Sequence, residues 1–218
     1  MGTDILRFEV RKKLIALTFD DGPNPPFTEA ILDILKNYGA RATFFCVGRQ
    51  IEAHRSVVRR AFAEGHQIGN HSYRHSDMSV MSYDAIKIEI ESTDRLIREI
   101  VGDSNIPFRA PYARESPTLT SYLSETNRPH FLFDVSPPPD YDHNDPMLIS
   151  AFVATHARRG SVVVLHDGGE EQGANRSETV QATEYIVAGF SAKGFKFASV
   201  SSLLEDAELS RCAIAGSP

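Results

Sequence analysis

The sequence lacks tryptophan altogether and has only two cysteines among its 218 residues. Cys46 lies in an apolar run and Cys212 in a tail of small residues, so their positions do not require a disulfide. No stretch approaches the ~20 consecutive apolar residues of a transmembrane helix. Basic residues are also few, because 23 Lys and Arg stand against 29 Asp and Glu, giving a net charge of −6. With no basic run longer than residues 11–13, nucleic acid is not expected as a partner.

A chain of this length can bury one substantial core, and no change in composition marks a second domain. We predict a single domain over residues 1–218, with its core between about residues 14 and 204. Residues 1–10 carry Asp4, Arg7 and Glu9 and lack the apolar core of a signal peptide. We therefore expect a cytoplasmic protein, unless the sequence has been trimmed.

Short apolar runs alternate with helical patterns along the chain, which is typical of repeated strand and helix units around a parallel sheet. The predicted strands cover residues 14–19, 42–47, 67–69, 107–109, 130–133, 161–165 and 195–200. Predicted helices begin near residues 27, 56, 82, 116, 145 and 177, and a final turn covers residues 201–204. The predicted fold class is therefore α/β.

Asp20 and Asp21 stand side by side where the first predicted strand ends, in the string T-F-D-D-G-P. Neighbouring carboxylates repel each other and resist desolvation, so the pair is stable mainly when a cation or a shared proton compensates it. A metal ion and a general base would resolve this conflict.

Polar side chains also stand at the carboxyl ends of later predicted strands, namely His71, Arg109, Asp134 and His166. In a parallel α/β barrel, these ends and the loops that follow form the face where chemistry is done. We expect the four groups to converge there with the aspartate pair.

The string H-S-Y-R-H places His71 and His75 four residues apart, and one helical turn would present both imidazoles to one metal ion. Two surface histidines are the alternative interpretation, but the aspartate pair supplies a third ligand. Two histidines and one carboxylate leave open coordination positions, as catalytic centres of hydrolases and of non-haem iron oxygenases do. The second carboxylate favours hydrolysis, because a hydrolase must deprotonate its attacking water.

His166 ends the buried run V-V-V-L-H, a position that suits a general acid for the leaving group. A hydrogen-bonded core histidine is the alternative. The remaining histidines show no metal-ligand spacing, and most are expected to be solvated or to lie on helix surfaces: His54, His66, His130, His143 and His156.

The strings T-F-D-D-G-P, H-S-Y-R-H, R-A-P-Y and L-H-D follow in this order between about residues 14 and 204. Together they resemble the motifs of the polysaccharide deacetylases, the NodB-homology domain of carbohydrate esterase family 4. The resemblance implies a distorted parallel (β/α)7 barrel similar to a TIM barrel. It also implies metal-dependent removal of N-acetyl or O-acetyl groups from a carbohydrate such as an N-acetylglucosamine oligomer, with release of acetate.

The resemblance assigns roles to the residues that match the family's motifs. Asp20 is the general base, and Asp21, His71 and His75 hold a divalent metal, usually zinc and sometimes cobalt or another ion. Arg109 orients the base. The metal ligands and the base are the same residues that the carboxylate and histidine pattern predicts.

The acid side of the site also follows from the resemblance. His166 is the general acid, and the backbone N–H of Tyr112 stabilises the oxyanion. Pro111, in the same motif, and Val164, where the family has leucine, are expected to contact the substrate. Valine should keep the pocket for the acetyl methyl group apolar and reshape it slightly.

The segment F-D-V-S-P-P-P-D-Y departs most from the family, where a W-D-V-D-x-x-D-W type of segment is common. Asp140 is the best match for the carboxylate that holds His166, and Asp134 is its competitor. Tyr141 stands where the family has tryptophan, so the wall on which the sugar stacks is altered.

Two other functions are compatible with the same fold. The absence of tryptophan and the prolines at 137–139 favour a hydrolase of a cyclic amide or an acetylated small molecule as an alternative to a carbohydrate deacetylase. A sugar-binding module without catalysis is a second alternative. The presence of every predicted catalytic group argues against that module.

Overall fold

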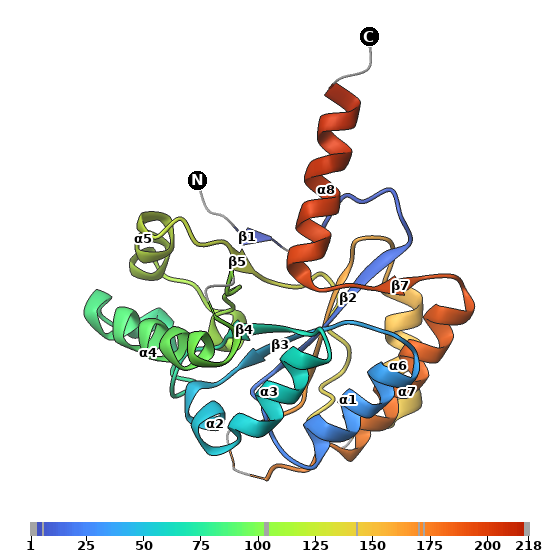
Figure 1. Ribbon diagram of the computed structural model, residues 1–218, viewed down its shortest axis with the longest axis horizontal. Coiled ribbons are helices and arrows are strands. Elements are labelled where there is room, and N and C mark those ends of the chain that lie inside the picture. The colour runs from blue at the N-terminus through green and yellow to red at the C-terminus, as the bar shows by residue number, and fades with distance from the viewer. Residues whose placement is uncertain are drawn as a thin grey trace.

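The computed structural model describes residues 4–5, 7–102, 105–142, 144–169, 171 and 173–215. Its central parallel sheet has the strand order β4, β3, β2 and β6, and β7 also pairs with β2 (Figure 1). A separate parallel pair joins β1 to β5. The strands are β1 (Asp4–Ile5), β2 (Leu14–Asp20), β3 (Thr43–Cys46), β4 (Gln67–Asn70), β5 (His130–Phe131), β6 (Val162–His166) and β7 (Lys196–Phe197).

Single-residue bridges continue the parallel pairing between the two ends of this sheet, as in a closed barrel. They join Asn70 to Phe108, Phe108 to His130, and Val135 to Val163. The predicted strand at 107–109 is thus reduced to one bridged residue, because Pro107 has no N–H to donate to a ladder. The prediction of a distorted parallel barrel is confirmed.

Strand β2 crosses the middle of the molecule and ends at Asp20. Ile15, Leu17 and Phe19 are fully buried in the largest apolar cluster. A continuous apolar run of this kind suits a strand that is covered on both faces. The register between β2 and β6 pairs Asp20 with His166, so two titratable residues lie side by side at the carboxyl end of the sheet.

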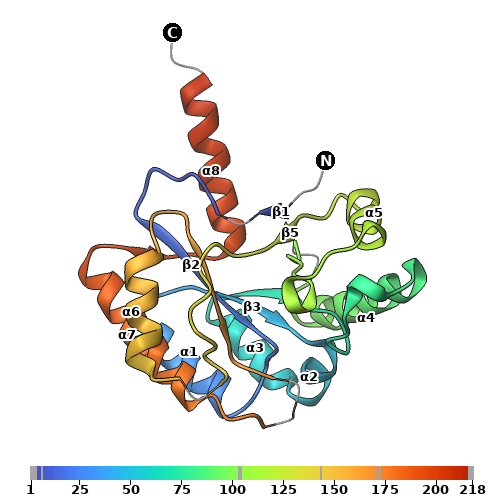
Figure 2. The same cartoon turned by 180° about the vertical axis from the view of Figure 1, so that it is seen from behind.

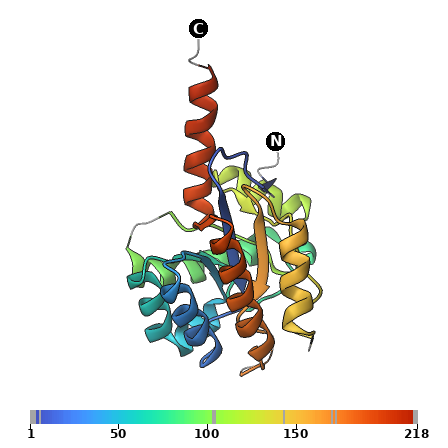
Figure 3. The same cartoon turned by 90° about the vertical axis from the view of Figure 1, so that its right-hand side faces the viewer.

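The helices surround the strands. They are α1 (Phe27–Asn37), α2 (Gly48–Ala53), α3 (Arg55–Ala63), α4 (Tyr83–Val101), α5 (Pro117–Glu125), α6 (Pro146–His156), α7 (Ser177–Ala192) and α8 (Val200–Ala215), with 3₁₀ turns η1 (Met78–Val80) and η2 (Pro111–Ala113). Helices α6 and α7 lie together on one flank and α4 and α5 on the other, as Figures 1 and 2 show. Helix α8 projects from the body of the molecule (Figure 3).

Three predicted helix starts are confirmed by their caps. Ser82, Ser116 and Asp145 accept backbone N–H groups of the first turns of α4, α5 and α6, at 3.4, 3.2 and 2.8 Å. The sequence did not predict α2, which is too short to show a period. Helix α8 extends well beyond the predicted final turn. The prediction stopped short because the sequence of this helix lacks a clear apolar stripe. Among the described helices, none combines the length and the apolar character needed to cross a bilayer.

Candidate active site

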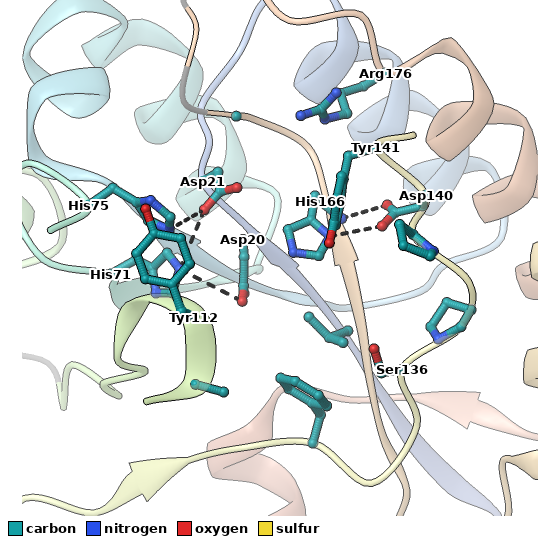
Figure 4. Close-up of a pocket in the computed structure, with 16 residues that line it drawn as sticks. Asp20, Asp21, His71, His75, Tyr112, Ser136, Asp140, Tyr141, His166 and Arg176 are labelled. Atoms are coloured by element: carbon teal, nitrogen blue, oxygen red, sulfur yellow. Dashed lines mark hydrogen bonds and ion pairs between the residues drawn. The ribbon is translucent and has the colours of Figure 1, made fainter. Parts of the chain in front are cut away.

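A cavity of about 370 Å³ opens at the carboxyl end of β2 and β6. Figure 4 shows two groups of side chains on its walls, with Asp20 between them. Asp21, His71 and His75 form one group, and His166 with Asp140 forms the other. Of the residues that the sequence placed at separate strand ends, the structure brings together all but Asp134, which binds Ser161 and Val162 instead.

Asp21, His71 and His75 offer three ligand atoms to one point. Asp21 Oδ1 lies 3.0 Å from His75 Nε2 and 3.4 Å from His71 Nε2. This oxygen is buried and accepts no hydrogen bond from the described residues. His71 Nδ1 lies 2.8 Å from the carbonyl oxygen of Arg109, to which it can donate only as N–H, so the lone pair of neutral His71 is on Nε2. An orphaned carboxylate oxygen that faces the Nε2 atoms of two imidazoles fits a divalent cation.

The segment that carries both histidines is a loop, and the predicted helical turn is wrong. Ser72 and His75 have φ values of 63° and 61°, which a right-handed helix does not contain. Glu89 of α4 holds the loop, because its Oε2 accepts the backbone N–H groups of Tyr73 and Arg74 at 2.9 and 2.7 Å. The two hydrogen bonds to Glu89 hold the loop in the conformation in which the imidazoles converge. The prediction had instead relied on the four-residue spacing of a helix.

Asp20 is held by a fully buried arginine. Arg109 Nη1 donates to Asp20 Oδ1 and to Thr18 Oγ1, both at 2.7 Å, while its Nε donates to the Phe131 carbonyl at 2.8 Å. The other carboxylate oxygen, Oδ2, lies 3.9 Å from His71 Nε2. One oxygen of Asp20 is thus fixed by a charge-assisted hydrogen bond and the other faces the predicted metal position.

His166 is paired with Asp140. Its Nδ1 lies 2.8 Å from Asp140 Oδ1, and its backbone N–H donates to Asp140 Oδ2 at 2.7 Å. Thr179 of α7 donates a further hydrogen bond to Oδ2 at 2.9 Å. Burial alone would lower the pKa of His166, but the hydrogen bond and charge of Asp140 outweigh it and raise the pKa to about 9.

The competing carboxylate, Asp134, lies outside this pair. Its oxygens accept from the Ser161 hydroxyl at 2.9 Å and from the Val162 N–H at 2.8 Å, at the opposite end of β6 from His166. Of the two candidates, only Asp140 touches His166. Through these hydrogen bonds, Asp134 connects the segment before the prolines at 137–139 to the start of β6.

Tyr112, predicted to bind the oxyanion through its backbone N–H, and the predicted substrate-contacting residues divide between the wall and the interior. Tyr112, Tyr141 and Val164 line the cavity, and both tyrosines are half exposed. The Tyr112 ring packs against His75 with centroids 4.7 Å apart, and the Tyr141 ring meets His166 edge-on at 4.8 Å. Pro111 is buried and is not among the described residues of the cavity wall.

Two residues of the loop after β6 were missed by the sequence reasoning. Arg176 lines the cavity. Asp167 is fully buried, and its Oδ2 accepts a hydrogen bond from the Thr28 hydroxyl at 2.5 Å. Burial raises the pKa of Asp167 to about 7, and the charges of Asp21 and Asp20 act in the same direction. The L-H-D string and the glycine-rich turn that follows are the signals in the sequence, but nothing in them shows that the loop folds back over the site.

The other histidines are not as solvated as expected. His66 and His130 are buried, and they accept backbone N–H groups from Ala42 and Ala110 at 3.2 and 3.0 Å. Burial lowers the pKa of His66 to about 4. His54 is half-buried, His156 is exposed, and His143 lies outside the described residues.

Comparison with known proteins identifies the class. A family model described as polysaccharide deacetylase matches residues 8–129, more than half of the chain. A peptidoglycan-N-acetylglucosamine deacetylase from Bacillus cereus is 32% identical over 194 residues, which cover 88% of this chain and 89% of the relative. A chitooligosaccharide deacetylase from Azorhizobium caulinodans is 30% identical over 199 residues, covering 87% and 93%. The chain belongs to the polysaccharide deacetylase family.

Solved structures agree in fold. A crystal structure of a peptidoglycan N-acetylglucosamine deacetylase superposes with a TM-score of 0.86 at 28% identity, covering 93% of this chain and 92% of the other. A family 4 acetyl xylan esterase from Clostridium thermocellum, solved in complex with a cobalt ion, gives a TM-score of 0.79 at 31% identity, covering 88% and 90%. The prediction of a hydrolase that deacetylates carbohydrates is confirmed at the level of the family.

Proposed function

We propose that this protein removes the N-acetyl group from N-acetylglucosamine units of a saccharide, using a divalent metal held by Asp21, His71 and His75. The observation that carries the proposal is the position of Asp20 between these ligands and the charged His166. The site thereby offers a base and an acid on either side of one cavity. The N-acetylglucosamine substrate is supported by the names of the relatives.

When bound by Asp21, His71 and His75, the metal would supply Lewis acidity for activating water and polarising the acetyl carbonyl. Zinc is the ion we favour, because two imidazoles and a carboxylate form a typical catalytic zinc set. Cobalt is the second candidate, given the ion in the structure of the related esterase.

The residues of the chain divide the proton transfers between them. Asp20 Oδ2 takes the proton from the attacking water, while Arg109 holds the other oxygen in place. The backbone N–H of Tyr112 donates to the oxyanion that forms at the former carbonyl oxygen. His166 holds Asp140 through Nδ1, so its Nε2–H protonates the departing nitrogen as the C–N bond breaks. Acetate and a free amine are the products.

The test of this proposal is Asp20→Asn. We expect a loss of 10²- to 10⁴-fold in kcat for acetate release from an N-acetylglucosamine tetramer, which is the usual contribution of a general base. The exposed Asp84→Asn controls for loss of a carboxylate elsewhere. Metal content is measured in both variants by elemental analysis. Wild-type activity in an Asp20→Asn protein that still holds its metal would refute the role of Asp20.

The metal ligands are tested separately. His71→Ala and His75→Ala should each lose the bound ion, because two remaining ligands hold it poorly. Zinc or cobalt is then added back to the stripped wild-type protein and the rates are compared. Full retention of metal by both alanine variants would reject the site.

A further inference from the structure

We infer that Arg176 determines substrate specificity by binding a carboxylate on the saccharide. The inference rests on the proposed function, since it names the kind of sugar that the same cavity takes. Arg176 immediately precedes α7 and lies on the cavity wall with Gly169 and Tyr141. In Figure 4 its guanidinium group stands beyond Tyr141, on the side of the cavity opposite Tyr112.

The contacts of Arg176 fix its side chain without neutralising it. Nε donates to the Gly168 carbonyl and Nη1 to the Asn175 carbonyl, each at 2.7 Å. Within the described part of the chain no carboxylate forms an ion pair with it, and Nη2 makes no hydrogen bond. The residue is only 7% exposed, so the cation is mostly withdrawn from water. A buried charge without a counter-ion is costly, and an anionic ligand would offset that cost.

Two glycines make room for this arrangement. A Cβ atom on Gly169 would lie 2.4 Å from Arg176 Nη2, and one on Gly168 would lie 2.2 Å from the Asp21 carbonyl oxygen. The segment at Gly168 and Gly169 therefore passes between the Asp21 backbone and the Arg176 guanidinium, in close contact with both. Arg176 is held in a fixed place relative to the reacting acetyl group, as a residue that reads a neighbouring substituent must be.

The chemistry of the group selects the ligand. A sugar hydroxyl gains little from a cation that it could not gain from a neutral amide, whereas a carboxylate forms a charge-assisted bond with guanidinium N–H groups. N-acetylmuramic acid is N-acetylglucosamine with an added lactyl ether, so the two sugars differ by the carboxylate that the inference requires. Acetate, the product, is the other carboxylate that reaches this cavity, and it would not distinguish the two sugars.

The experiment compares two substrates and three variants. The substrates are a tetramer of N-acetylglucosamine and a tetramer in which N-acetylmuramic acid alternates with it. The variants are Arg176→Met, Arg176→Lys and, as a control, Arg158→Met, which removes an exposed arginine near the opposite end of β6. We expect Arg176→Met to lower kcat/KM at least 10-fold on the muramyl tetramer, mainly through KM, and less than 3-fold on the neutral one. Lysine should restore part of the difference, and Arg158→Met should change neither rate.

Ionic strength gives a second readout on the unaltered protein. Between 50 and 500 mM salt, kcat/KM for the muramyl tetramer should fall more than that for the neutral tetramer. An equal fall on both substrates in Arg176→Met would show a purely structural role and overturn the inference. Product inhibition by acetate that changes equally for both substrates would do the same, by assigning Arg176 to the product.

Binding keeps the inference testable if the proposed function fails. If the wild-type protein deacetylates neither tetramer, the proposed function is wrong, and the affinities for N-acetylmuramic acid and N-acetylglucosamine are compared by NMR titration. Tighter binding of the acidic sugar that disappears in Arg176→Met supports the role of Arg176. Equal affinities in the wild-type protein contradict it.

Discussion

At the scale of single residues, the site depends on which carboxylates are neutralised and which are free. Asp20 and Asp140 each have an oxygen fixed by one partner, Arg109 and His166 respectively. Under the proposed function, the first pair leaves Asp20 available as a base, and the second keeps His166 charged as an acid. The same residue type therefore supplies opposite chemistry through its partner.

The pKa of His166 gives a prediction for the pH dependence of the reaction. The acid form is present below a pKa of about 9 and is lost as the pH rises through that value. Asp140→Asn removes the main cause of the raised pKa, while burial continues to lower it. We expect the alkaline limb of the kcat profile to move to lower pH in this variant. Initial rates from pH 5 to 10.5 measure the shift.

Asp134→Asn is the matched control for that profile. It removes an aspartate of the same segment that contacts Ser161 and Val162 but not His166. We expect the alkaline limb to stay in place and the melting temperature to fall. An Asp140→Asn limb that coincides with that of Asp134→Asn would contradict the assignment.

The residue scale also shows the limit of the sequence. A motif can place Asp20, Asp21 and His166 at strand ends, because apolar runs bounded by polar residues locate those ends. It cannot choose between Asp134 and Asp140, since the intervening prolines have no period and the choice depends on how that loop turns. Arg176 was missed because its place in the site likewise depends on how a loop turns.

At the scale of elements, helix α4 positions the metal-ligand loop from outside the barrel. Glu89 is buried and binds two consecutive N–H groups between the histidines. The positive φ values of Ser72 and His75 are less favourable than ordinary backbone and persist only where neighbouring contacts enforce them. Helix α4 thus supplies, through Glu89, hydrogen bonds that the loop would otherwise form within regular secondary structure.

This arrangement predicts that Glu89→Ala weakens metal binding by roughly 10-fold, the lower end of what loss of an outer support usually does. Glu89→Gln should weaken it less, because its amide oxygen still accepts a hydrogen bond. Competition with a fluorescent chelator measures the affinity. Glu91→Ala, on the exposed side of the same helix, is the control. A folded Glu89→Ala protein that binds metal as tightly as the wild type would exclude this role.

Most elements were predictable in proportion to their length, and α8 is the exception among the long helices. Long helices with caps, such as α4 with Ser82, followed from spacing and turn residues. Between β4 and β6, the barrel strands are reduced to two residues or to single bridges, because Pro107 and the loops near 134–139 interrupt the ladders. Register between distant strands, which pairs Asp20 with His166, has no local signal at all.

At the scale of the whole molecule, one ion would join segments that are far apart in sequence. Asp21 follows β2, and His71 and His75 follow β4. A cation that binds this arrangement and not the unfolded chain stabilises the fold by mass action, by about 2.7 kcal/mol at 100 times its Kd.

Metal removal should therefore lower the melting temperature, by on the order of 5–10 °C for a chain of this size. Differential scanning calorimetry with and without a chelator measures the change, and added zinc should reverse it. His71→Ala should show no further decrease with the chelator. An unchanged wild-type melting temperature, with metal loss verified by elemental analysis, would contradict the prediction.

The register of β2 against β6 has a consequence for how this protein can change. The residues proposed to hold the metal and to activate water lie between residues 20 and 112, whereas the proposed proton donor and Arg176 lie between residues 140 and 176. The two segments meet only because adjacent strands end together. A chimera that receives residues 133–176 from a relative would inherit that relative's choice of sugar while keeping its own metal centre. On the proposed roles, substrate preference would thus be inherited together with the proton donor and separately from the metal centre.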